Sequence, residues 1–329
     1  MDEKLKAIAE QAERAKLESE LATLKKHLAE TKKINSVLSE ELNRRGATPA
    51  KTPKPKTTKT TGHCRAIISD THGCHLDLRA WSAVLADLKR LPVREVVLLG
   101  DHAETGGFLA EHHVPMFMAE AQYSYADDLA AANQMLDELQ AATPGAEYHY
   151  LEGNHEGRIE KWCMQTAIYS GDDREMLRRA IAPEFRLKLA ERGIRYYRRS
   201  EFNETTKERG VLQLGNCYFV HEVSSAKNAA KIALDKFAGN VVFGHTHRAD
   251  SATVRKPNVG TISAYNPGCL CAARPLWQHT RGAVNEWTHG FAIQLVQKDG
   301  SFLHINVPVV DGTSLLMPLT RTIGGATDE

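Results

Sequence analysis

Five short segments rich in Asp, Asn and His recur in the middle of the chain, and each directly follows a short apolar run. The apolar runs are typical of buried strands and span residues 65–69, 95–99, 147–151, 217–220 and 240–243. In a layered α/β fold, the loops that follow several strands converge at one edge. We therefore expect one shared site, built from Asp70-Thr71-His72, Gly100-Asp101, Gly153-Asn154-His155-Glu156, His221 and Gly244-His245-Thr246-His247.

The rest of the chain from residue 64 fits the same α/β class. Helical periodicity covers residues 75–91, 126–141, 156–169 and 225–237, and further β-rich runs cover residues 259–264, 291–296 and 302–309. An apolar fraction of 42% and a charged fraction of 25% are those of a soluble globular protein. No stretch approaches the length of a membrane span, and no apolar signal region follows the first residues. We expect a cytoplasmic protein without a membrane partner.

The residue types in the five segments favour two divalent metal ions. Asp70 and His72 can point into one cavity, and Asp101, at the next strand end, is the natural bridge between two ions. The other expected ligands are the neutral amide oxygen of Asn154 and the imidazoles of His221, His245 and His247. Two ions about 3.5–4 Å apart activate a bound water for in-line attack on phosphorus.

The motif that begins at Gly153 contains or precedes three further residues with possible roles in the reaction: His155, Glu156 and Arg158. His155 is suited to protonating the leaving alkoxide, a general-acid role worth about 10²–10⁴-fold in rate. Glu156 could orient an imidazole or act as an acid at a helix N-terminus. Arg158 could pair with a phosphate oxygen or form a surface salt bridge. His102, beside a ligand, could support the metal centre or contact substrate.

The five segments, read as D-x-H, G-D, G-N-H-E, H and G-H-x-H, resemble the signature of the calcineurin-like metallophosphoesterase superfamily over residues 64–312. The resemblance implies an α/β (α+β) fold, a four-layer α-β-β-α sandwich with a dinuclear centre. The ions would be Mn²⁺ first, with Fe, Zn or Mg as alternatives. One ion would take Asp70, His72, Asp101 and His247, and the other would take Asp101, Asn154, His221 and His245. His155 matches the leaving-group acid of the family.

Several departures from the family pattern bear on substrate choice. The protein-phosphatase branch places an Arg after the G-D motif, and residues 100–106 contain none. Glu222 follows His221 where many relatives have Gly. The G-N-H-E-x-R form and Trp287 are similar to bacteriophage and prophage members, which would place the protein in a host cytoplasm.

Outside this domain, the N-terminal segment predicts self-association. A heptad spacing runs from Leu17 to Leu42, and a single Asn35 at an a position favours a parallel two-stranded coiled coil. We expect residues 1–45 to form a homodimer, with an amphipathic helix packed on its own domain as the alternative. Residues 46–63 read as a flexible basic linker and residues 313–329 as a C-terminal tail. The long connection 103–125 reads as a substrate-selecting lid or a packing segment.

Three functions remain open from the sequence. The first is a dinuclear phosphodiesterase that acts on a phosphoester, with nucleic acid as a candidate partner and nuclease activity. Residues 64–329 carry 28 Lys and Arg against 32 Asp and Glu, which is no electrostatic footprint for duplex DNA. The second is a phosphomonoesterase acting on phosphoprotein or a small ester. The third is a non-catalytic assembly protein that retains the phosphoesterase scaffold.

Overall fold

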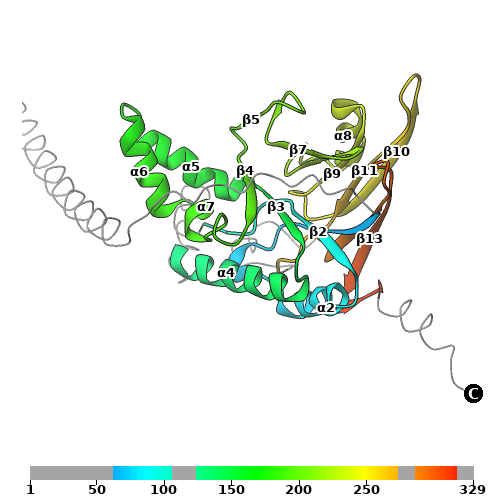
Figure 1. Ribbon diagram of the computed structural model, residues 1–329, viewed down its shortest axis with the longest axis horizontal. Helices are drawn as coiled ribbons and strands as arrows, with labels where there is room; N and C mark the ends of the chain where they lie inside the picture. The colour runs from blue at the N-terminus through cyan, green and yellow to red at the C-terminus, as the bar shows by residue number, and fades with distance from the viewer. Residues whose placement is uncertain (1–61, 106–123, 273–285, 317–329) are drawn as a thin grey trace, which may run out of the picture. The chain divides into compact units, whose positions relative to one another are not determined.

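The computed structural model describes residues 62–105, 124–272 and 286–316, all within one compact unit that spans Thr57–Glu329. The described residues form a mixed α/β fold with two main sheets and a separate hairpin, which confirms the predicted fold class at this level (Figure 1). The expected coiled coil, most of the expected linker, the 106–123 part of the long connection and the chain from residue 317 lie outside the described residues.

The larger sheet supplies the strands that lead into the first three motifs. Its order is β14 (Thr313–Ser314), β13 (Phe302–Val310), β12 (Gly290–Val296), β1 (His63–Ile68), β2 (Val93–Leu98), β3 (Glu147–Leu151) and β4 (Ile194–Tyr197). Strands β1 to β4 are parallel, so their carboxyl ends meet at one edge. Strands β12, β13 and β14 extend the sheet with antiparallel pairing.

The smaller sheet supplies the strands that lead into the last two motifs. Its order is β10 (Ala249–Lys256), β11 (Gly260–Pro267), β9 (Asn240–Phe243), β8 (Cys217–Val220) and β7 (Val211–Leu214). Strands β8 and β9 are parallel, so His221 and Gly244 follow neighbouring strand ends. The separate hairpin joins β5 (Phe202–Asn203) to β6 (Glu208–Arg209).

The helices cover both sheets. They are the 3-10 turn η1 (Gly73–His75) and the α-helices α2 (Leu78–Leu88), α4 (Tyr125–Ala142), α5 (Asn154–Thr166), α6 (Gly171–Ile181), α7 (Pro183–Arg186) and α8 (Ala229–Phe237). Helices α2 and α4 lie along the larger sheet, while α5, α6 and α7 gather beside β4 (Figure 1). Buried Ile159, Cys163 and Ala182 form the small core that joins α5 to the chain before α7.

Alternate side chains of the larger sheet face two different apolar cores. Ile68 and Leu98 pack with the buried side chains of α2 and α4. Ile67 and Val97 point the other way and pack against the smaller sheet, where Phe219 is fully buried. Each such buried side chain contributes about 1.5–3 kcal/mol. Helix α8 covers the outer face of the smaller sheet, so the packing order is helices, sheet, sheet, helix.

Regions without a continuous apolar run differ most from the sequence expectations. Neither β10 nor β4 was expected, because β10 alternates exposed and half-buried residues and the exposed Arg195 interrupts β4. Helices α6 and α7 were also missed. The fold continues past residue 312, the expected end of the domain, because Ser314 is buried and donates a hydrogen bond to Asp87. None of the described helices is long and apolar enough to cross a membrane.

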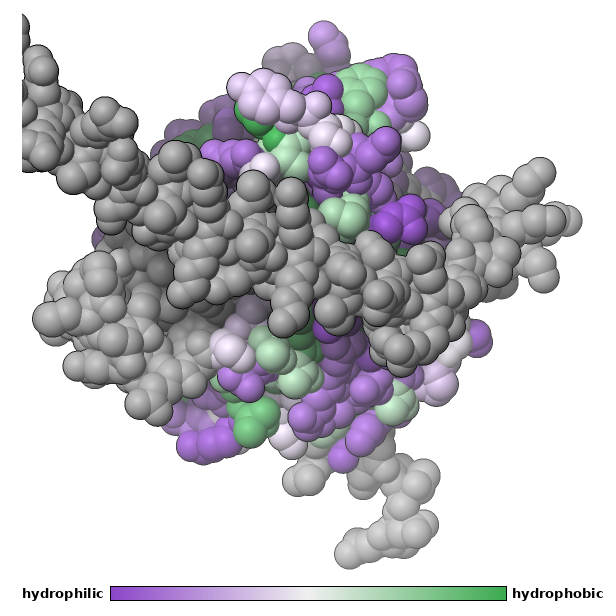
Figure 2. Space-filling model, turned by 90° about the vertical axis from the view of Figure 1, so that its left-hand side faces the viewer, coloured by the Kyte–Doolittle hydropathy of each residue, from purple (hydrophilic) through white to green (hydrophobic). Residues whose placement is uncertain are grey.

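The described surface is mainly hydrophilic with small apolar areas on the face shown in Figure 2. Scattered apolar residues are normal on such surfaces.

Candidate metal centre

The five motifs meet where the carboxyl-terminal ends of strands β1, β2 and β3 of the larger sheet approach those of β8 and β9 of the smaller sheet. The approach is close, because Nδ1 of His221, beyond β8, lies 2.9 Å from the carbonyl oxygen of Leu99, beyond β2. The motif loops turn sharply after their strands. Five of the seven predicted ligands have left-handed backbone, with φ between 50° and 69°: Asp70, His72, Asp101, His245 and His247. Such values are uncommon for residues other than Gly and cluster at functional sites.

Two glycines allow the loops after β2 and β3 to touch. Gly100 has φ 106°, and a Cβ there would lie 2.6 Å from the backbone nitrogen of Gly153. A Cβ on Gly153 would lie 2.1 Å from Oδ1 of Asp101. No larger residue fits either position without moving a predicted ligand.

The first group of donors joins Asp70, His72 and His247. Nε2 of His247 lies 3.1 Å from Oδ1 of Asp70 and 3.0 Å from Nε2 of His72. All three side chains are buried. Oδ1 of Asp70 has no hydrogen-bond partner among the described residues, although Oδ2 accepts from Ser69 and from the backbone N–H of His245.

The second group joins Asp101, Asn154, His221 and His245. Oδ1 of Asn154 lies 2.9 Å from Nε2 of His221 and 2.8 Å from Nδ1 of His245. Nε2 of His221 also lies 3.2 Å from Oδ2 of Asp101. Because Nδ1 of His221 donates to the Leu99 carbonyl, its Nε2 presents a lone pair to the group when the ring is neutral.

Asp101 lies between the two groups. Its ligand oxygen is within 4.8 Å of donor atoms on His72 and His155, and also within 4.8 Å of donor atoms on His221 and His245. Burial alone would raise the pKa of Asp101, but the neighbouring imidazoles of His221 and His155 hold it well below its usual range. An ionised carboxylate at this place has the position required of a bridging ligand.

The donor set fits two divalent cations. The lone pairs of imidazole nitrogens and carboxylate oxygens face one another, and one buried carboxylate oxygen lacks any described hydrogen-bond donor. Buried polar atoms are normally paired, and a cation satisfies several acceptors at once. The oxygen and imidazole ligands suit Mn, Fe, Zn or Mg.

Glu104 is a member of the site that the sequence did not reveal. Its fully buried carboxylate lies 2.5 Å from Nδ1 of His72 and 3.3 Å from Nδ1 of His155. Burial raises its pKa, but the charges of His155 and His72 outweigh this and lower it. An ionised carboxylate only accepts, so Nδ1 of His72 donates and its Nε2 faces the first donor group. The only sign of this role in the sequence was the position of Glu104, an acid three residues after the predicted ligand Asp101.

His155 lies between Glu104 and Asp101. Its backbone N–H donates to Oδ1 of Asp101 at 2.8 Å, and its Nε2 lies 3.8 Å from Oδ2 of the same residue. Burial lowers the pKa of His155, but the carboxylates of Glu104 and Asp101 raise it to about 9. The ring edge also contacts His72, with centroids 4.7 Å apart. The imidazole of His155 therefore lies beside the donor groups, with its ring nearly perpendicular to that of His72.

Glu156 organises backbone and contacts no imidazole among the described residues. Its two oxygens accept from the backbone N–H groups of Asp101, His102, Ala103 and Gly153 at 2.7–3.1 Å. The Tyr150 hydroxyl donates a fifth hydrogen bond. The expectation that Glu156 orients an imidazole is therefore wrong. Its place at the start of α5 agrees with the alternative role at the helix N-terminus.

His102 is fully buried, which excludes the expected contact with substrate. Its Nδ1 lies 2.9 Å from Oγ1 of Thr71, and its ring packs edge-on against Tyr150. Two further residues beside His247 were not expected in the site. Sγ of Cys271 lies 3.9 Å from Nδ1 of His247, and the ring of Trp287 lies 4.0 Å from the same imidazole.

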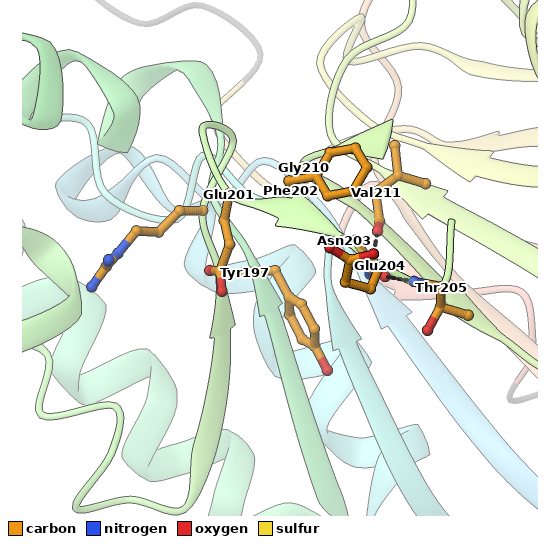
Figure 3. Close-up of a pocket in the computed structure, with 9 residues that line it drawn as sticks. Tyr197, Glu201, Phe202, Asn203, Glu204, Thr205, Gly210 and Val211 are labelled. Atoms are coloured by element: carbon orange, nitrogen blue, oxygen red, sulfur yellow. Dashed lines mark hydrogen bonds between the residues drawn. The ribbon is translucent and has the colours of Figure 1, made fainter. Parts of the chain in front are cut away.

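The rim of the second donor group carries an ion pair. Glu222 accepts a hydrogen bond from Nη2 of Arg199 at 2.8 Å, and its other carboxylate oxygen lies 3.7 Å from Nε2 of His245. Beyond Arg199, a cavity of about 290 Å³ opens between the end of β4 and the β5–β6 hairpin (Figure 3). Tyr197, Arg198, Phe202 and Val211 are among the residues that line it, and none of its lining residues is a predicted ligand.

Residues 65–285, more than half of the chain, match the family model of the calcineurin-like phosphoesterase superfamily domain. The chain belongs to this superfamily. Its members normally bind divalent metals, and the described His and Asp groups are candidate sites for them. No curated protein matches the chain.

Solved structures with similar folds include three examples. Wild-type Vps29 of Entamoeba histolytica complexed with zinc has 14% identity and a TM-score of 0.38, covering 76% of this chain and 95% of that one. A metallophosphoesterase from Sphaerobacter thermophilus has 16% identity and a TM-score of 0.34, with coverage of 82% and 96%. YfcE, a phosphoesterase from E. coli, has 14% identity and a TM-score of 0.31, with coverage of 74% and 98%.

Proposed function

We propose that this chain is a dinuclear-metal phosphodiesterase, with nuclease activity as the first form to test. The single observation that carries the proposal is the place of Asp101 between two groups of metal-binding side chains. One group contains Asp70, His72 and His247, and the other contains Asn154, His221 and His245. A pair of ions bridged by one carboxylate suits in-line displacement at phosphorus.

The chain's own residues divide the work of the reaction. When bound, the metal ions polarise the phosphoryl group and lower the pKa of water. His155 is placed to hold a proton for the leaving oxygen, because its Nδ1 faces Glu104 and its Nε2 faces the donor groups. Glu104 holds the imidazoles of His72 and His155 in the required tautomers.

The resemblance of residues 153–158 to phage members supports testing nucleic acids first, with Mn²⁺ as the first metal. The negative balance of residues 64–329 favours single-stranded or small substrates over duplex DNA. A phosphomonoesterase is the second candidate. The guanidiniums of Arg158 and Arg199 each retain an N–H without a described partner, which suits the extra charge of a monoester.

A non-catalytic assembly protein is the third candidate, and the complete donor set argues against it. A protein that only retained the scaffold would have no need of a buried His155 flanked by Glu104 and Asp101. We also propose that residues 1–45 form a dimerisation helix and that a linker joins them to the catalytic domain. This domain begins with β1 at His63 and includes β14, so the proposed tail follows Ser314.

The deciding experiment compares hydrolysis of bis-p-nitrophenyl phosphate and p-nitrophenyl phosphate by Mn²⁺-loaded protein. A phosphodiesterase turns over the diester faster, and a nuclease also cleaves labelled single-stranded oligonucleotides. Asp101→Asn should abolish both activities, whereas Asp137→Asn, on the exposed side of α4, should retain them. If the purified protein binds no metal and hydrolyses neither ester, the non-catalytic function replaces this proposal.

A further inference from the structure

Arg199 follows β4 and reaches the rim of the second donor group. Its backbone N–H donates to Oε2 of Glu152 at 2.8 Å, and its Nη2 donates to Oε2 of Glu222 at 2.8 Å. Glu222 directly follows His221, and its other oxygen approaches His245. Glu152 therefore holds the backbone of Arg199, and Glu222 holds its guanidinium beside the ligands of the proposed second ion.

The same guanidinium is not fully satisfied. Nη1 of Arg199 is enclosed, yet it has no hydrogen-bond partner among the described residues. The side chain as a whole is 38% exposed, so part of it is open to an incoming ligand. An unpaired enclosed N–H costs free energy, and a phosphate oxygen is the acceptor that a guanidinium binds most strongly.

A second arginine approaches from the neighbouring helix. Arg158 is on the first turns of α5, and the charge of Arg158 acts on His155. Its Nη1 also lacks a described hydrogen-bond partner. The aliphatic stem of Arg199 crosses this part of α5, because a Cβ on Gly157 would lie 3.6 Å from Cδ of Arg199. Arg158 on α5 and the stem of Arg199 against Gly157 therefore lie at the same part of this helix, which also carries Asn154 and His155.

We propose that Arg199 binds a non-bridging oxygen of the substrate phosphate and that Glu222 is its positioning residue. The inference rests on the proposed phosphoesterase function and deepens it. It accounts for two departures of this sequence together, since no Arg follows Asp101 and an acid follows His221. The guanidinium supplied elsewhere by the motif comes here from the end of β4, and Glu222 fixes its direction.

The test measures binding of inorganic phosphate to Zn²⁺-loaded protein by isothermal titration calorimetry, without turnover. Arg199→Gln should weaken phosphate binding by about 10–100-fold, the usual value of a charge-assisted contact. Arg199→Lys should restore part of it, because the charge returns without the bidentate geometry. Glu222→Gln should weaken binding less, and its effect should vanish in the Arg199→Gln background.

Arg195→Gln is the matched control. Arg195 belongs to β4, the strand that Arg199 follows, but it pairs with Glu147 and Tyr197, so its removal should leave phosphate affinity unchanged. Metal content and thermal unfolding are measured for every variant, so that loss of metal or of fold is recognised.

Unchanged phosphate affinity in Arg199→Gln with full metal content would overturn the inference, and so would absence of phosphate binding to the wild-type protein. A wild-type protein that binds phosphate through Arg199 but hydrolyses no ester would contradict the proposed function instead. The two failures are therefore distinguishable.

Discussion

The carboxylate of Glu104 lies 2.5 Å from Nδ1 of His72, and neither residue is exposed to solvent. This contact fixes the His72 ring so that Nε2 faces Asp70 and His247. The same carboxylate reaches Nδ1 of His155. One acid therefore controls both a proposed metal ligand and the proposed proton donor.

We expect Glu104→Gln to lower metal affinity by about 10–100-fold, as removal of a group that orients a ligand commonly does. The amide keeps the size of the side chain but loses the charge that fixes the two imidazoles. Metal titration of the apo protein measures the effect, with exposed Glu191→Gln as the control. An unchanged affinity would show that His72 is oriented without this contact.

His155→Ala should lower kcat by about 10²–10⁴-fold for esters with poor alkoxide leaving groups. The loss should be much smaller for p-nitrophenyl esters, because p-nitrophenolate leaves without protonation. Steady-state rates on both kinds of ester, at equal metal content, give the comparison. Equal losses for the two leaving groups would contradict the assignment of His155 as the acid.

Gly153→Ala should abolish binding of at least one metal ion. The added methyl would lie 2.1 Å from Oδ1 of Asp101 and would displace this carboxylate. Gly171→Ala is the control, because Gly171 begins α6 and only a flexible arginine end lies within 4 Å of its Cβ position. That change should be neutral or stabilising by up to about 1 kcal/mol. Elemental analysis and thermal unfolding separate the two outcomes.

His304 predicts a loss of stability on acidification. Burial, including the stacking of its ring on Tyr265, lowers its pKa from 6.5 to about 4, although the contact of its Nε2 with Oδ1 of Asn306 at 2.8 Å opposes this shift. Between these values the unfolded chain binds the extra proton and the folded protein does not, so stability falls as pH decreases. The decrease from this residue is about 1–3 kcal/mol. Urea unfolding at pH 7 and pH 5 should show a weaker pH dependence in His304→Gln; an identical dependence would assign the effect to other groups.

The heptad in residues 17–42 predicts that the full chain is a dimer. Light scattering should give twice the chain mass for residues 1–329 and a single chain mass for residues 64–329. Asn35→Leu should raise thermal stability and relax the number of strands, as removal of a buried polar a residue does. A full-length monomer would instead favour the helix packed on its own domain.

The parts of the fold that the sequence predicted share one physical property. Strands β8 and β9 have apolar runs that end in a motif, and β3 places buried Tyr148, Tyr150 and Leu151 before its motif. The observed bounds of all three strands equal the expected ones. By contrast, β10 pairs with β11 through alternating polar residues, so its strand character depends on a partner rather than on its own apolarity. Tertiary pairing decides such segments.

The candidate site shows the same division. Asp70, Asp101 and Asn154 could be predicted as ligands from their residue type and their position at the ends of strands. Glu104 and Arg199 could not be predicted in this way, because the role of each depends on a contact with a residue that is distant in sequence. Glu222 was noticed as an unusual residue, but only the contact with Arg199 gives it a role. Sequence reasoning locates ligands more readily than the residues that orient them.

The hydrogen bonds of Glu156 have a consequence for the spacing between the two proposed ions. This carboxylate joins the backbone of residues 101–103 to that of Gly153, and so ties the loop of the bridging Asp101 to the loop of Asn154. Glu156 thereby sets the distance between the two halves of the centre, although it contacts only the backbone of Asp101 and not its carboxylate. A change at position 156 would shift the loop of Asp101 relative to that of Asn154 and so alter the spacing of the centre, although no coordinating residue was substituted.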